Sequence, residues 1–346
     1  MERLPHIIET QQFTVDWLEE DFFPLVDEME ELLEKREEGK LGSPLRTDLA
    51  DKNVSEFFYG ASTRTMTTFL IAAREMGATS FSTDNASISS SAVKGESLED
   101  SIKILSGYRA LDLIALRTPI SSKEEEMKKL KVKNAVPFST KPIINAGDRD
   151  EQHPTQTLID LYTIKKQKGA IAGLKIGLGG DIGGSRTAKS LIYLATKYQG
   201  VQFGIISPEL SRISDDLRDY LKRHKVKFIE DNDARKYAHT FDVYYVVRVQ
   251  TENDEEGATR KQILKYGEAF WAANNELLNI LPKDAIILDP LPRTQVELPY
   301  ETDKDPRAVY FKQAQYGESV RMALLLTLLK EPYRTTFLQK TNPLSF

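Results

Sequence analysis

The stretch GASTRTMTTF, which begins at residue 60, brings four hydrogen-bond donors together within four positions. Ser62, Thr63 and Thr65 carry hydroxyls, and Arg64 carries a guanidinium that can bind an oxyanion through two parallel hydrogen bonds. The segment follows a strand-like run and opens a helix-like one, so backbone N–H groups and the helix dipole also favour an anion. A capped helix start with an exposed arginine is the alternative reading. Four donors in four residues favour a phosphate site.

A second candidate lies in the motif DEQHPTQTLIDLY. His153 stands directly before Pro154, and proline is favoured in the first turn of a helix. The helix dipole disfavours the charged imidazole, so we expect a neutral His153, with Gln156 on the same helical face. A helix start packed for structural reasons would explain the motif equally well.

Three further motifs follow strand-like runs. GGDIGGSRT lacks the third glycine of a dinucleotide-binding G-x-G-x-x-G, because Ile182 stands there, and we interpret it as a tight turn that presents Arg186. Arg248 and Gln250 stand two apart in VVRVQ, so their side chains point to the same side of a strand. The two prolines of DPLPR, at 289–293, would hold backbone carbonyls in a fixed extended array.

Strand-like apolar runs alternate with helical patterns along the chain, in two series. The strands are predicted at 54–59, 78–83, 112–117 and 141–146, and then at 174–180, 201–207, 226–231, 241–249 and 285–291. Such alternation predicts parallel sheets covered by helices, so the fold class is α/β with two domains. Ligands bind at the carboxyl ends of strands in these sheets, where most of the motifs stand, which assigns the motifs to one site.

Helical patterns separate most of these strands. They are predicted after Arg64, after Ser97, around Lys123–Leu130 and from Val320 to Leu329. Thr14 is a candidate cap for a first helix that breaks or restarts at Pro24. The acidic stretch 250–261 has no apolar period and is predicted to be a mobile surface loop.

The composition limits the classes of function. The 346 residues suffice for two domains, and 47 Lys+Arg against 52 Asp+Glu give a net charge of -5, which does not favour a nucleic-acid partner. The absence of cysteine excludes disulfides and thiolate sites, and four histidines make a multi-histidine zinc site an unfavoured reading. The apolar runs are shorter than the ~20 residues of a membrane span, and the first residues lack a signal-peptide pattern. We therefore expect a soluble, cytoplasmic protein with no membrane partner.

The motifs STRT, KGE, HPTQT, RVQ and LPR occur in this order, and together they resemble the catalytic chains of the aspartate carbamoyltransferase family. The resemblance extends from Ile8 to Leu329, nearly the whole chain. STRT and HPTQ are shared with other transcarbamylases. RVQ and PLPR favour the aspartate enzymes over the ornithine enzymes, whose typical Cys-Leu-Pro and Ser-Met-Gly motifs this chain lacks.

The resemblance implies how these motifs bind carbamoyl phosphate. Arg117, in LIALRTP, matches an arginine that bridges the phosphate and the carbonyl oxygen, and His153 matches a donor to that oxygen. Gln156 and the backbone at Pro290 and Leu291 match the groups around the carbamoyl amino group. The loop that holds the phosphate is matched by Ser62, Thr63, Arg64 and Thr65, and Ser90 is a further contact.

The resemblance also implies an aspartate site and a catalytic set. Arg186, Arg248, Gln250 and Lys94 match the groups that bind aspartate, and Ser90 and Lys94 lie in a loop that enters the active site of a neighbouring subunit. The implied catalytic residues are His153, Arg64, Thr65, Arg117 and Lys94. An oxyanion develops on the carbamoyl carbonyl during attack, and the donors Thr65, Arg117 and His153 would each stabilise it by roughly 3–4 kcal/mol.

The implied protein has two α/β domains with the active site between them. Residues 1–153, completed by 318–346, would bind carbamoyl phosphate, and residues 154–317 would bind aspartate. The implied reaction is carbamoyl phosphate plus L-aspartate giving N-carbamoyl-L-aspartate and phosphate, a step of pyrimidine synthesis, with no metal or organic cofactor. The implied assembly is a homotrimer with shared active sites. Regulatory chains are an open alternative, because the sequence does not say whether they bind. A transcarbamylase for another amino acid, or an impaired scaffold paralogue, remains as an alternative.

Several positions depart from the family pattern. Gly60 and Met66 flank STRT where a glutamate and an arginine are usual, and Asn253 stands where a partner of that glutamate is usual. Asp289 replaces the histidine of His-Pro-Leu-Pro, and Val93 replaces a second lysine before the KGE motif. The residues implied to contact substrate are kept, so the departures bear on rate, affinity and domain closure.

Overall fold

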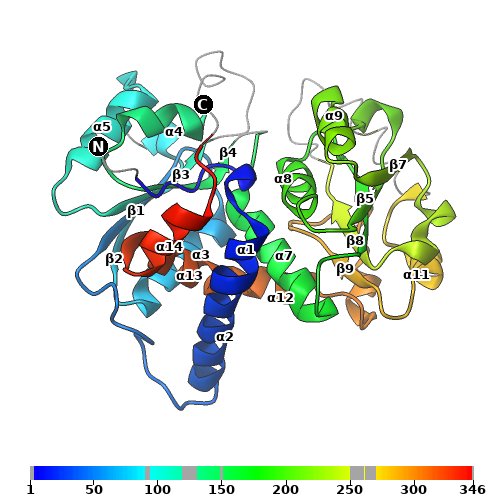
Figure 1. The fold of residues 1–346 in the computed structure, drawn as a ribbon, viewed down its shortest axis with the longest axis horizontal. Helices are drawn as coiled ribbons and strands as arrows, with labels where there is room; N and C mark the ends of the chain where they lie inside the picture. The colour runs from blue at the N-terminus through cyan, green and yellow to red at the C-terminus, as the bar shows by residue number, and fades with distance from the viewer. Residues whose placement is uncertain are drawn as a thin grey trace. The chain divides into compact units, whose positions relative to one another are not determined.

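The computed structural model describes residues 4–89, 94–118, 131–148, 151–249, 261 and 270–344. The chain forms two compact units, each with its own sheet (Figure 1). Unit 1 comprises Met1–Leu158 and Tyr316–Phe346, and unit 2 comprises Ile159–Gln315. Unit 2 is therefore inserted into the sequence of unit 1.

Unit 1 contains a parallel sheet in the order β2-β1-β3-β4. Its strands are β1 (Asn53–Phe58), β2 (Thr79–Thr83), β3 (Leu113–Thr118) and β4 (Ile143–Asp148), which confirms the four predicted runs. β3 and β4 are buried throughout and β1 nearly so, because helices cover both faces of a parallel sheet. β2 forms one edge and is largely exposed.

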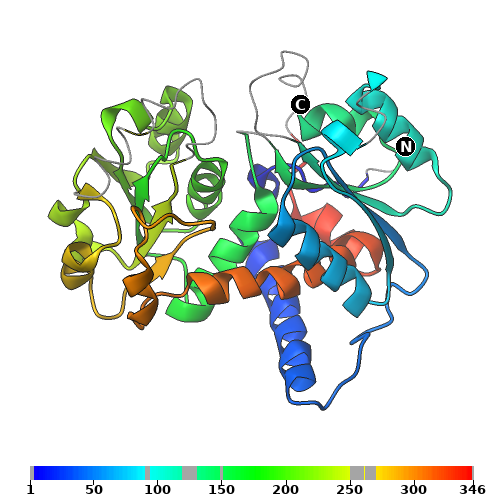
Figure 2. The same ribbon diagram turned by 180° about the vertical axis from the view of Figure 1, so that it is seen from behind.

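Two groups of helices lie on opposite sides of these strands (Figures 1 and 2). α13 is apolar around its circumference and packs against α2, α3 and α14, which explains why it is buried almost throughout. On the other side, α5 and α6 cover Phe57, Ile114 and Leu116. The helices are α2 (Phe23–Glu37), α3 (Thr63–Glu75), α4 (Ala86–Ser89), α5 (Leu98–Gly107), α6 (Val132–Ala135), α13 (Gly317–Leu329) and α14 (Tyr333–Lys340).

The first helix begins as predicted. The Thr14 hydroxyl accepts a hydrogen bond from Trp17 N at 3.2 Å and caps α1 (Val15–Trp17). A π-helical turn over Leu18–Phe22 leads into α2, in whose first turn Pro24 lies. The sequence therefore locates both the cap and the irregularity, since proline cannot donate to the preceding turn.

Unit 2 contains a parallel sheet in the order β7-β6-β5-β8-β9. Its strands are β5 (Lys175–Gly180), β6 (Gln202–Ile206), β7 (Lys227–Asp231), β8 (Val243–Val247) and β9 (Ile286–Leu288). All five predicted runs are confirmed. β8 ends before Arg248 and β9 ends before Asp289, so the predicted strands at 241–249 and 285–291 are too long at their carboxyl ends. RVQ and DPLPR follow these strands instead of ending them.

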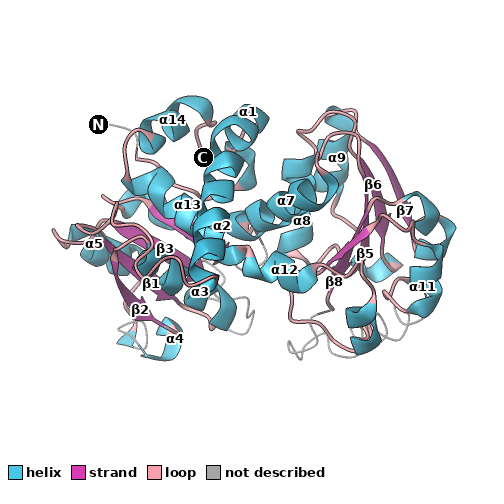
Figure 3. Cartoon of the chain, turned by 90° about the horizontal axis from the view of Figure 1, so that it is seen from below, coloured by secondary structure: helices cyan, strands magenta, loops and turns pink. Residues whose placement is uncertain are grey.

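The helices of unit 2 lie on both sides of its strands. Figure 3 shows α8 and α9 on one side and α11 on the other. The described helices of this unit are α7 (Pro154–Lys168), which begins in unit 1, α8 (Arg186–Ala195), α9 (Asp215–Arg223), α11 (Asn275–Ile280) and α12 (Tyr310–Gln315). Among the described residues of both units, short 3₁₀ turns span Thr10–Gln12, Val136–Phe138, Glu209–Ser211, Ala234–Lys236, Ala238–Thr240 and Tyr300–Lys304.

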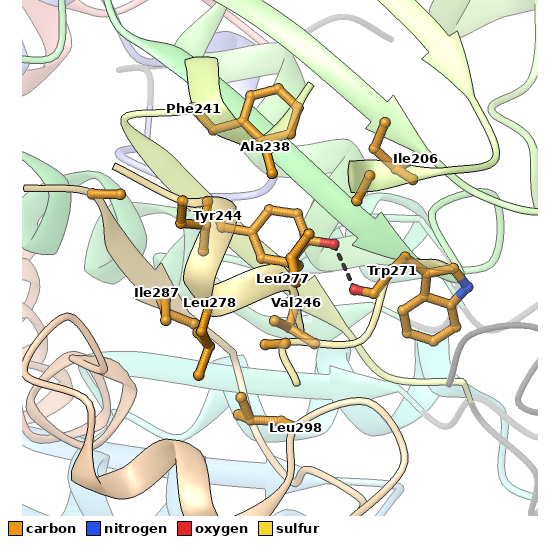
Figure 4. Packing of buried hydrophobic residues seen from close by; sticks show 14 of the residues in the cluster. Ile206, Ala238, Phe241, Tyr244, Val246, Trp271, Leu277, Leu278, Ile287 and Leu298 are labelled. Atoms are coloured by element: carbon orange, nitrogen blue, oxygen red, sulfur yellow. Dashed lines mark hydrogen bonds between the residues drawn. The ribbon is translucent and has the colours of Figure 1, made fainter. Parts of the chain in front are cut away.

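A buried cluster between the sheet and α11 holds the second side of unit 2 together (Figure 4). Trp271, Tyr244 and Tyr310 are its largest side chains, and Phe241 with Leu277 and Leu278 of α11 also belongs to the cluster. The Tyr244 hydroxyl donates to the Trp271 carbonyl at 2.5 Å, and burial raises the pKa of Tyr244 above its ordinary value. The buried phenol is therefore a protonated donor with a partner, which removes the cost of burying it.

One predicted helix and one predicted loop concern segments that the structure does not describe. The helix predicted around Lys123–Leu130 and the loop predicted at 250–261, Lys261 excepted, lie outside the described residues. Within the described ranges, none of the helices combines the length and the apolar character needed to cross a bilayer.

Candidate active site

The strand order of unit 1 locates a binding position. The chain moves from β1 to one side for β2 and to the other side for β3, so β1 and β3 are neighbours whose following loops diverge. In open α/β sheets, ligands bind at the carboxyl ends of such a strand pair. Ser62 follows β1, and Arg117 lies near the end of β3, so two predicted site residues stand at this position.

The STRT segment forms the first turn of α3. Ser62 is the N-cap residue, but its side chain makes no cap hydrogen bond to any described residue, and Met66 N makes the first helical bond, to Ser62 O at 3.0 Å. The backbone N–H groups of Thr63, Arg64 and Thr65 precede that bond and point out of the helix end. Thr65 is buried, whereas Thr63 and Arg64 are exposed. The helix end can therefore receive an anion, with an exposed guanidinium beside it.

Arg117 and His153 meet at Gly147. A Cβ atom placed on Gly147 would lie 2.4 Å from Arg117 Nη1 and 3.3 Å from His153 Nε2, so both side chains close on the same backbone position. Gly147 has φ +124°, a conformation that only glycine adopts without strain. Arg117 Nη1 donates to the Ala146 carbonyl at 3.1 Å, and both Arg117 and His153 are buried. A cation and an imidazole are thus fixed side by side.

A set of polar side chains that the sequence did not reveal fixes this arrangement. Asp148 accepts hydrogen bonds from the Thr118 hydroxyl at 2.7 Å and from Val132 N at 3.0 Å. Asn145 Oδ1 accepts from Gly147 N at 2.8 Å. The bond from Thr118 holds the end of β4 against β3, at a shift in the pairing register between Leu116 and Thr118, and the bond from Val132 ties the same end to α6. No local motif marks Asp148, because its partners Thr118 and Val132 come from other elements.

His153 directly precedes α7, as predicted. Its carbonyl accepts from Gln156 N at 3.0 Å and from Thr157 N at 3.1 Å, so the residue is the N-cap. The imidazole Nδ1 lies 3.3 Å from the Thr155 hydroxyl, which leaves Nε2 on the side of Gly147. Gln156 is half-buried one turn into the same helix.

The strand order of unit 2 locates a second position, between β5 and β8, where the chain again diverges. Arg186 is the first residue of α8 and is buried, and the Ser185 hydroxyl caps the helix by accepting from Ala188 N at 3.2 Å. Asp181 holds the preceding turn by accepting from Gly184 N at 3.1 Å and from the Ser211 hydroxyl. Asp181 is a structural residue of this site that the sequence interpretation missed.

Arg248 follows β8 and belongs to the same position. The next residue, Val249, donates from its N–H to Glu297 Oε1 at 2.7 Å, and Thr294 N donates to Glu297 Oε2 at 3.1 Å. Glu297 is fully buried, so it fixes the course of the chain beside Arg248. Its sequence position, in an irregular segment after β9, gave no sign of this role. Arg186, at the start of the helix after β5, and Arg248, directly after β8, therefore follow adjacent strands.

The Pro290–Leu291 segment follows β9 in a tight turn. Leu291 has φ +55°, a left-handed conformation that costs a side chain other than glycine roughly 1–2 kcal/mol. Its N–H donates to Asp289 Oδ1, an Asx turn that stabilises this conformation. The backbone of the segment is therefore bent, in place of the extended array expected from its prolines.

Lys94, Ser90 and Gln250 are the remaining predicted site residues. Lys94 is exposed and has no hydrogen bond or ion pair to another described residue. Ser90 and Gln250 lie outside the described residues, as do the departures Val93 and Asn253.

The comparisons with known proteins agree with both units. A model for "Aspartate/ornithine carbamoyltransferase, carbamoyl-P binding domain" matches residues 5–166, and one for the "Asp/Orn binding domain" matches residues 172–328. The chain is 38% identical to an aspartate carbamoyltransferase of Oryza sativa subsp. japonica, covering 94% of this chain and 85% of that protein. It is 39% identical to an aspartate carbamoyltransferase catalytic subunit of Clostridium kluyveri, covering 94% and 97%.

Solved structures show the same fold. The catalytic subunit of M. jannaschii aspartate transcarbamoylase has a TM-score of 0.79 at 35% identity, covering 94% of this chain and 98% of that chain. Aspartate transcarbamoylase from Trypanosoma cruzi, in complex with carbamoyl aspartate and phosphate, has a TM-score of 0.80 at 27% identity, covering 94% and 95%. The predicted α/β class and the predicted resemblance are confirmed: the chain belongs to the aspartate/ornithine carbamoyltransferase family.

Proposed function

We propose that this chain transfers the carbamoyl group of carbamoyl phosphate to the amino group of L-aspartate, giving N-carbamoyl-L-aspartate and phosphate. The observation that carries the proposal is the fixed pair of Arg117 and His153 at Gly147, in the unit whose α3 offers an anion-binding helix end. The names of the plant and bacterial relatives, at 38% and 39% identity, support aspartate as the acceptor and the pyrimidine pathway as the setting.

Unit 1 supplies the chemistry of the carbamoyl group in this proposal. The first turn of α3, with Ser62, Thr63, Arg64 and Thr65, binds the phosphate. His153 Nε2, Arg117 and Thr65 donate to the carbonyl oxygen, which becomes an oxyanion when the aspartate amine attacks the carbamoyl carbon. The same cations then stabilise the leaving phosphate. Gln156 and the carbonyls of Pro290 and Leu291 accept from the carbamoyl amino group.

Unit 2 supplies the aspartate site in this proposal. Arg186 and Arg248 follow adjacent strands, β5 and β8, and two carboxylates are the natural partners of two guanidinium groups. Gln250 and Lys94 complete the aspartate site, and Ser90 contacts carbamoyl phosphate. Lys94 also lowers the mutual repulsion of the two anionic substrates, which places it among the catalytic residues with Arg64, Thr65, Arg117 and His153.

The test measures the release of phosphate from carbamoyl phosphate with a coupled assay, in the presence and in the absence of L-aspartate. We expect that phosphate is released only when aspartate is present, and that one carbamoyl aspartate is formed for each phosphate released. A panel of other amino acids, ornithine included, separates this function from a transcarbamylase for another amine. No turnover with any amine, although carbamoyl phosphate binds, would indicate the impaired scaffold paralogue.

Gly147→Ala is expected to lower kcat about tenfold. The added Cβ would lie 2.4 Å from Arg117 Nη1, and the φ of +124° disfavours alanine, so the Arg117–His153 pair must move. Gly107→Ala is the matched control, because nothing lies within 4 Å of a Cβ there and its φ is not positive. Equal kcat values for the two variants would contradict the role given to the pair.

We also propose a homotrimer in which Lys94 serves the site of a neighbouring subunit. The exposed edge strand β2, whose Phe81 is 58% exposed, favours a protein interface on unit 1, and Lys94 is exposed. His153→Ala and Lys94→Ala chains should each be nearly inactive. When the two are unfolded, mixed equally and reassembled, ~1/4 of sites carry both residues intact, so activity should recover to ~25% of wild type. Verified mixed trimers without recovery would place Lys94 in its own chain's site or in none.

The cytoplasmic location and the regulatory chains stay predictions. The plant relatives are named chloroplastic, and the bacterial relatives are named catalytic subunits. These names describe the location and the assembly of the relatives.

A further inference from the structure

A chain of buried polar side chains runs through unit 2 to the Pro290–Leu291 turn. The Tyr245 hydroxyl donates to Asp160 Oδ2 at 2.9 Å, and Gln313 Nε2 donates to Asp160 Oδ1 at 2.6 Å. Gln313 Oε1 in turn accepts from Asp289 N at 3.0 Å, and Asp289 Oδ1 accepts from Leu291 N. Tyr245, Asp160, Gln313 and Asp289 are all at most 1% exposed. Buried polar groups of this kind hold their partners in one geometry.

Gln313 has only one orientation that satisfies its partners. Asp160 offers a carboxylate oxygen and requires a donor, whereas Asp289 offers a backbone N–H and requires an acceptor. The amide of Gln313 provides a donor to the first and an acceptor to the second. Reversing the amide, or replacing it by a carboxylate, would put two acceptors together at Asp160.

Both the backbone N–H and the side-chain carboxylate of Asp289 are hydrogen-bonded. Its N–H is fixed by Gln313, and its carboxylate fixes Leu291 N and thereby the left-handed φ of +55°. The directions of the Pro290 and Leu291 carbonyls follow from these torsion angles. The fixed reference is Asp160, which lies four residues after Gln156 on the same face of α7.

We propose that Asp160 and Gln313 are positioning residues that aim the carbonyls of Pro290 and Leu291 at the carbamoyl amino group, and so select a carbamoyl phosphate against acyl phosphates that lack it. The proposal rests on the proposed function. Asp160 and Gln313 touch no substrate themselves, and act only through Asp289. Their loss should therefore affect recognition of the amino group and leave recognition of the phosphate unchanged.

Carbamoyl phosphate and acetyl phosphate form a matched ligand pair, because a methyl group replaces the amino group in the second. We expect the wild-type chain to bind carbamoyl phosphate at least tenfold more tightly than acetyl phosphate. Gln313→Glu should reduce that ratio about tenfold through weaker carbamoyl phosphate binding, with the dissociation constants of acetyl phosphate and inorganic phosphate changed less than twofold. Gln315→Glu is the control, because it makes the same change at an exposed position of α12.

The double variant Asp160→Asn with Gln313→Glu should restore most of the ratio. The amide introduced at position 160 would then donate to one oxygen of the carboxylate introduced at position 313. The other oxygen of that carboxylate would accept from Asp289 N, and the Tyr245 hydroxyl would still donate to the side chain at position 160. The total charge equals that of the wild type. Gln313→Met fills the same space without a hydrogen bond, and it decides the question if Gln313→Glu does not fold.

The outcomes separate the possibilities. A selective loss that the double variant restores supports the proposal. An equal loss for carbamoyl, acetyl and inorganic phosphate would show a structural role only, and an unchanged ratio in Gln313→Glu and Gln313→Met would overturn the proposal. A wild-type chain that forms carbamoyl aspartate but binds the two phosphates equally would also overturn the proposal. A wild-type chain that forms no carbamoyl aspartate would instead refute the proposed function.

Discussion

His153→Ala is expected to lower kcat by about 10²–10³, the effect of removing one preorganised donor to a developing oxyanion. The imidazole Nε2 is fixed beside Arg117 at Gly147, so the alanine variant loses a donor that no other described residue of that turn replaces. The affinity for inorganic phosphate should change less than twofold, because the first turn of α3 and Arg64 remain.

The measurement is steady-state kinetics with both substrates saturating, together with phosphate binding by calorimetry. His239→Ala serves as the control, since His239 is exposed in a 3₁₀ turn of unit 2. A His153→Ala variant with an unchanged kcat would remove His153 from the oxyanion site. A parallel loss of phosphate binding would show that His153 supports the fold of the turn.

Glu56→Gln is expected to make unit 1 more stable than the wild type at alkaline pH. Glu56 lies in β1 with no exposed surface, and neither carboxyl oxygen has a hydrogen-bond partner among the described residues. Burial raises the pKa of Glu56 from 4.5 to about 8. The folded chain therefore keeps this proton at neutral pH, because the ionised form would be a buried charge without a partner.

The direction of the pH dependence follows from that pKa. The folded chain binds the proton more tightly than the unfolded chain, so unfolding releases it between pH 4.5 and about 8, and the free energy of unfolding falls as pH rises through this window. The slope is about 1.4 kcal/mol per pH unit, so Glu56 should remove about 3 kcal/mol of stability between pH 5.5 and pH 8. Glutamine does not ionise, so the free energy of unfolding of the variant should not show this fall with rising pH.

The two tryptophans allow unit 1 to be observed alone. Trp17 is buried in unit 1 and Trp271 in unit 2, so a Trp271→Phe background leaves Trp17 fluorescence as the reporter of urea unfolding. The stability difference between Glu56→Gln and its parent should move by about 3 kcal/mol in favour of glutamine from pH 5.5 to pH 8.5. Glu37→Gln, at an exposed position of α2, should show no such change. Parallel pH curves for Glu56→Gln and its parent would show that the buried carboxyl does not titrate in this range.

The sequence predicted the fold well because local patterns and tertiary packing agree in it. The strands of a parallel sheet are covered on both faces, so they read as apolar runs bounded by turns, and all nine predicted runs are strands of the two sheets. The error at the end of β8 has the same origin. Val249 is buried, with its N–H bonded to Glu297, and continues the apolar pattern, although the chain has left the sheet at Arg248.

The candidate site was predictable where a motif is local. The first turn of α3 and the N-cap at His153 follow from adjacent residues and have the predicted form. The meeting of Arg117 and His153 was not visible, because it depends on the φ of Gly147, and a glycine at a strand end is common. The buried pair of Asp160 and Gln313 joins residues far apart in sequence, and neither residue has a neighbour that marks it.

The insertion of unit 2 within unit 1 sets the order in which the chain becomes able to fold during synthesis. α13, which packs against α2 and α3, is made only after the whole of unit 2. About 170 residues separate the end of the first segment of unit 1 from the end of α13, which at 5–20 residues per second is ~10–30 s of translation. For that time the faces of α2 and α3 that α13 covers in the folded chain have no permanent cover. The ribosome-bound chain is therefore a client for chaperones until its last helices emerge, while the inserted unit, a continuous segment, can fold first.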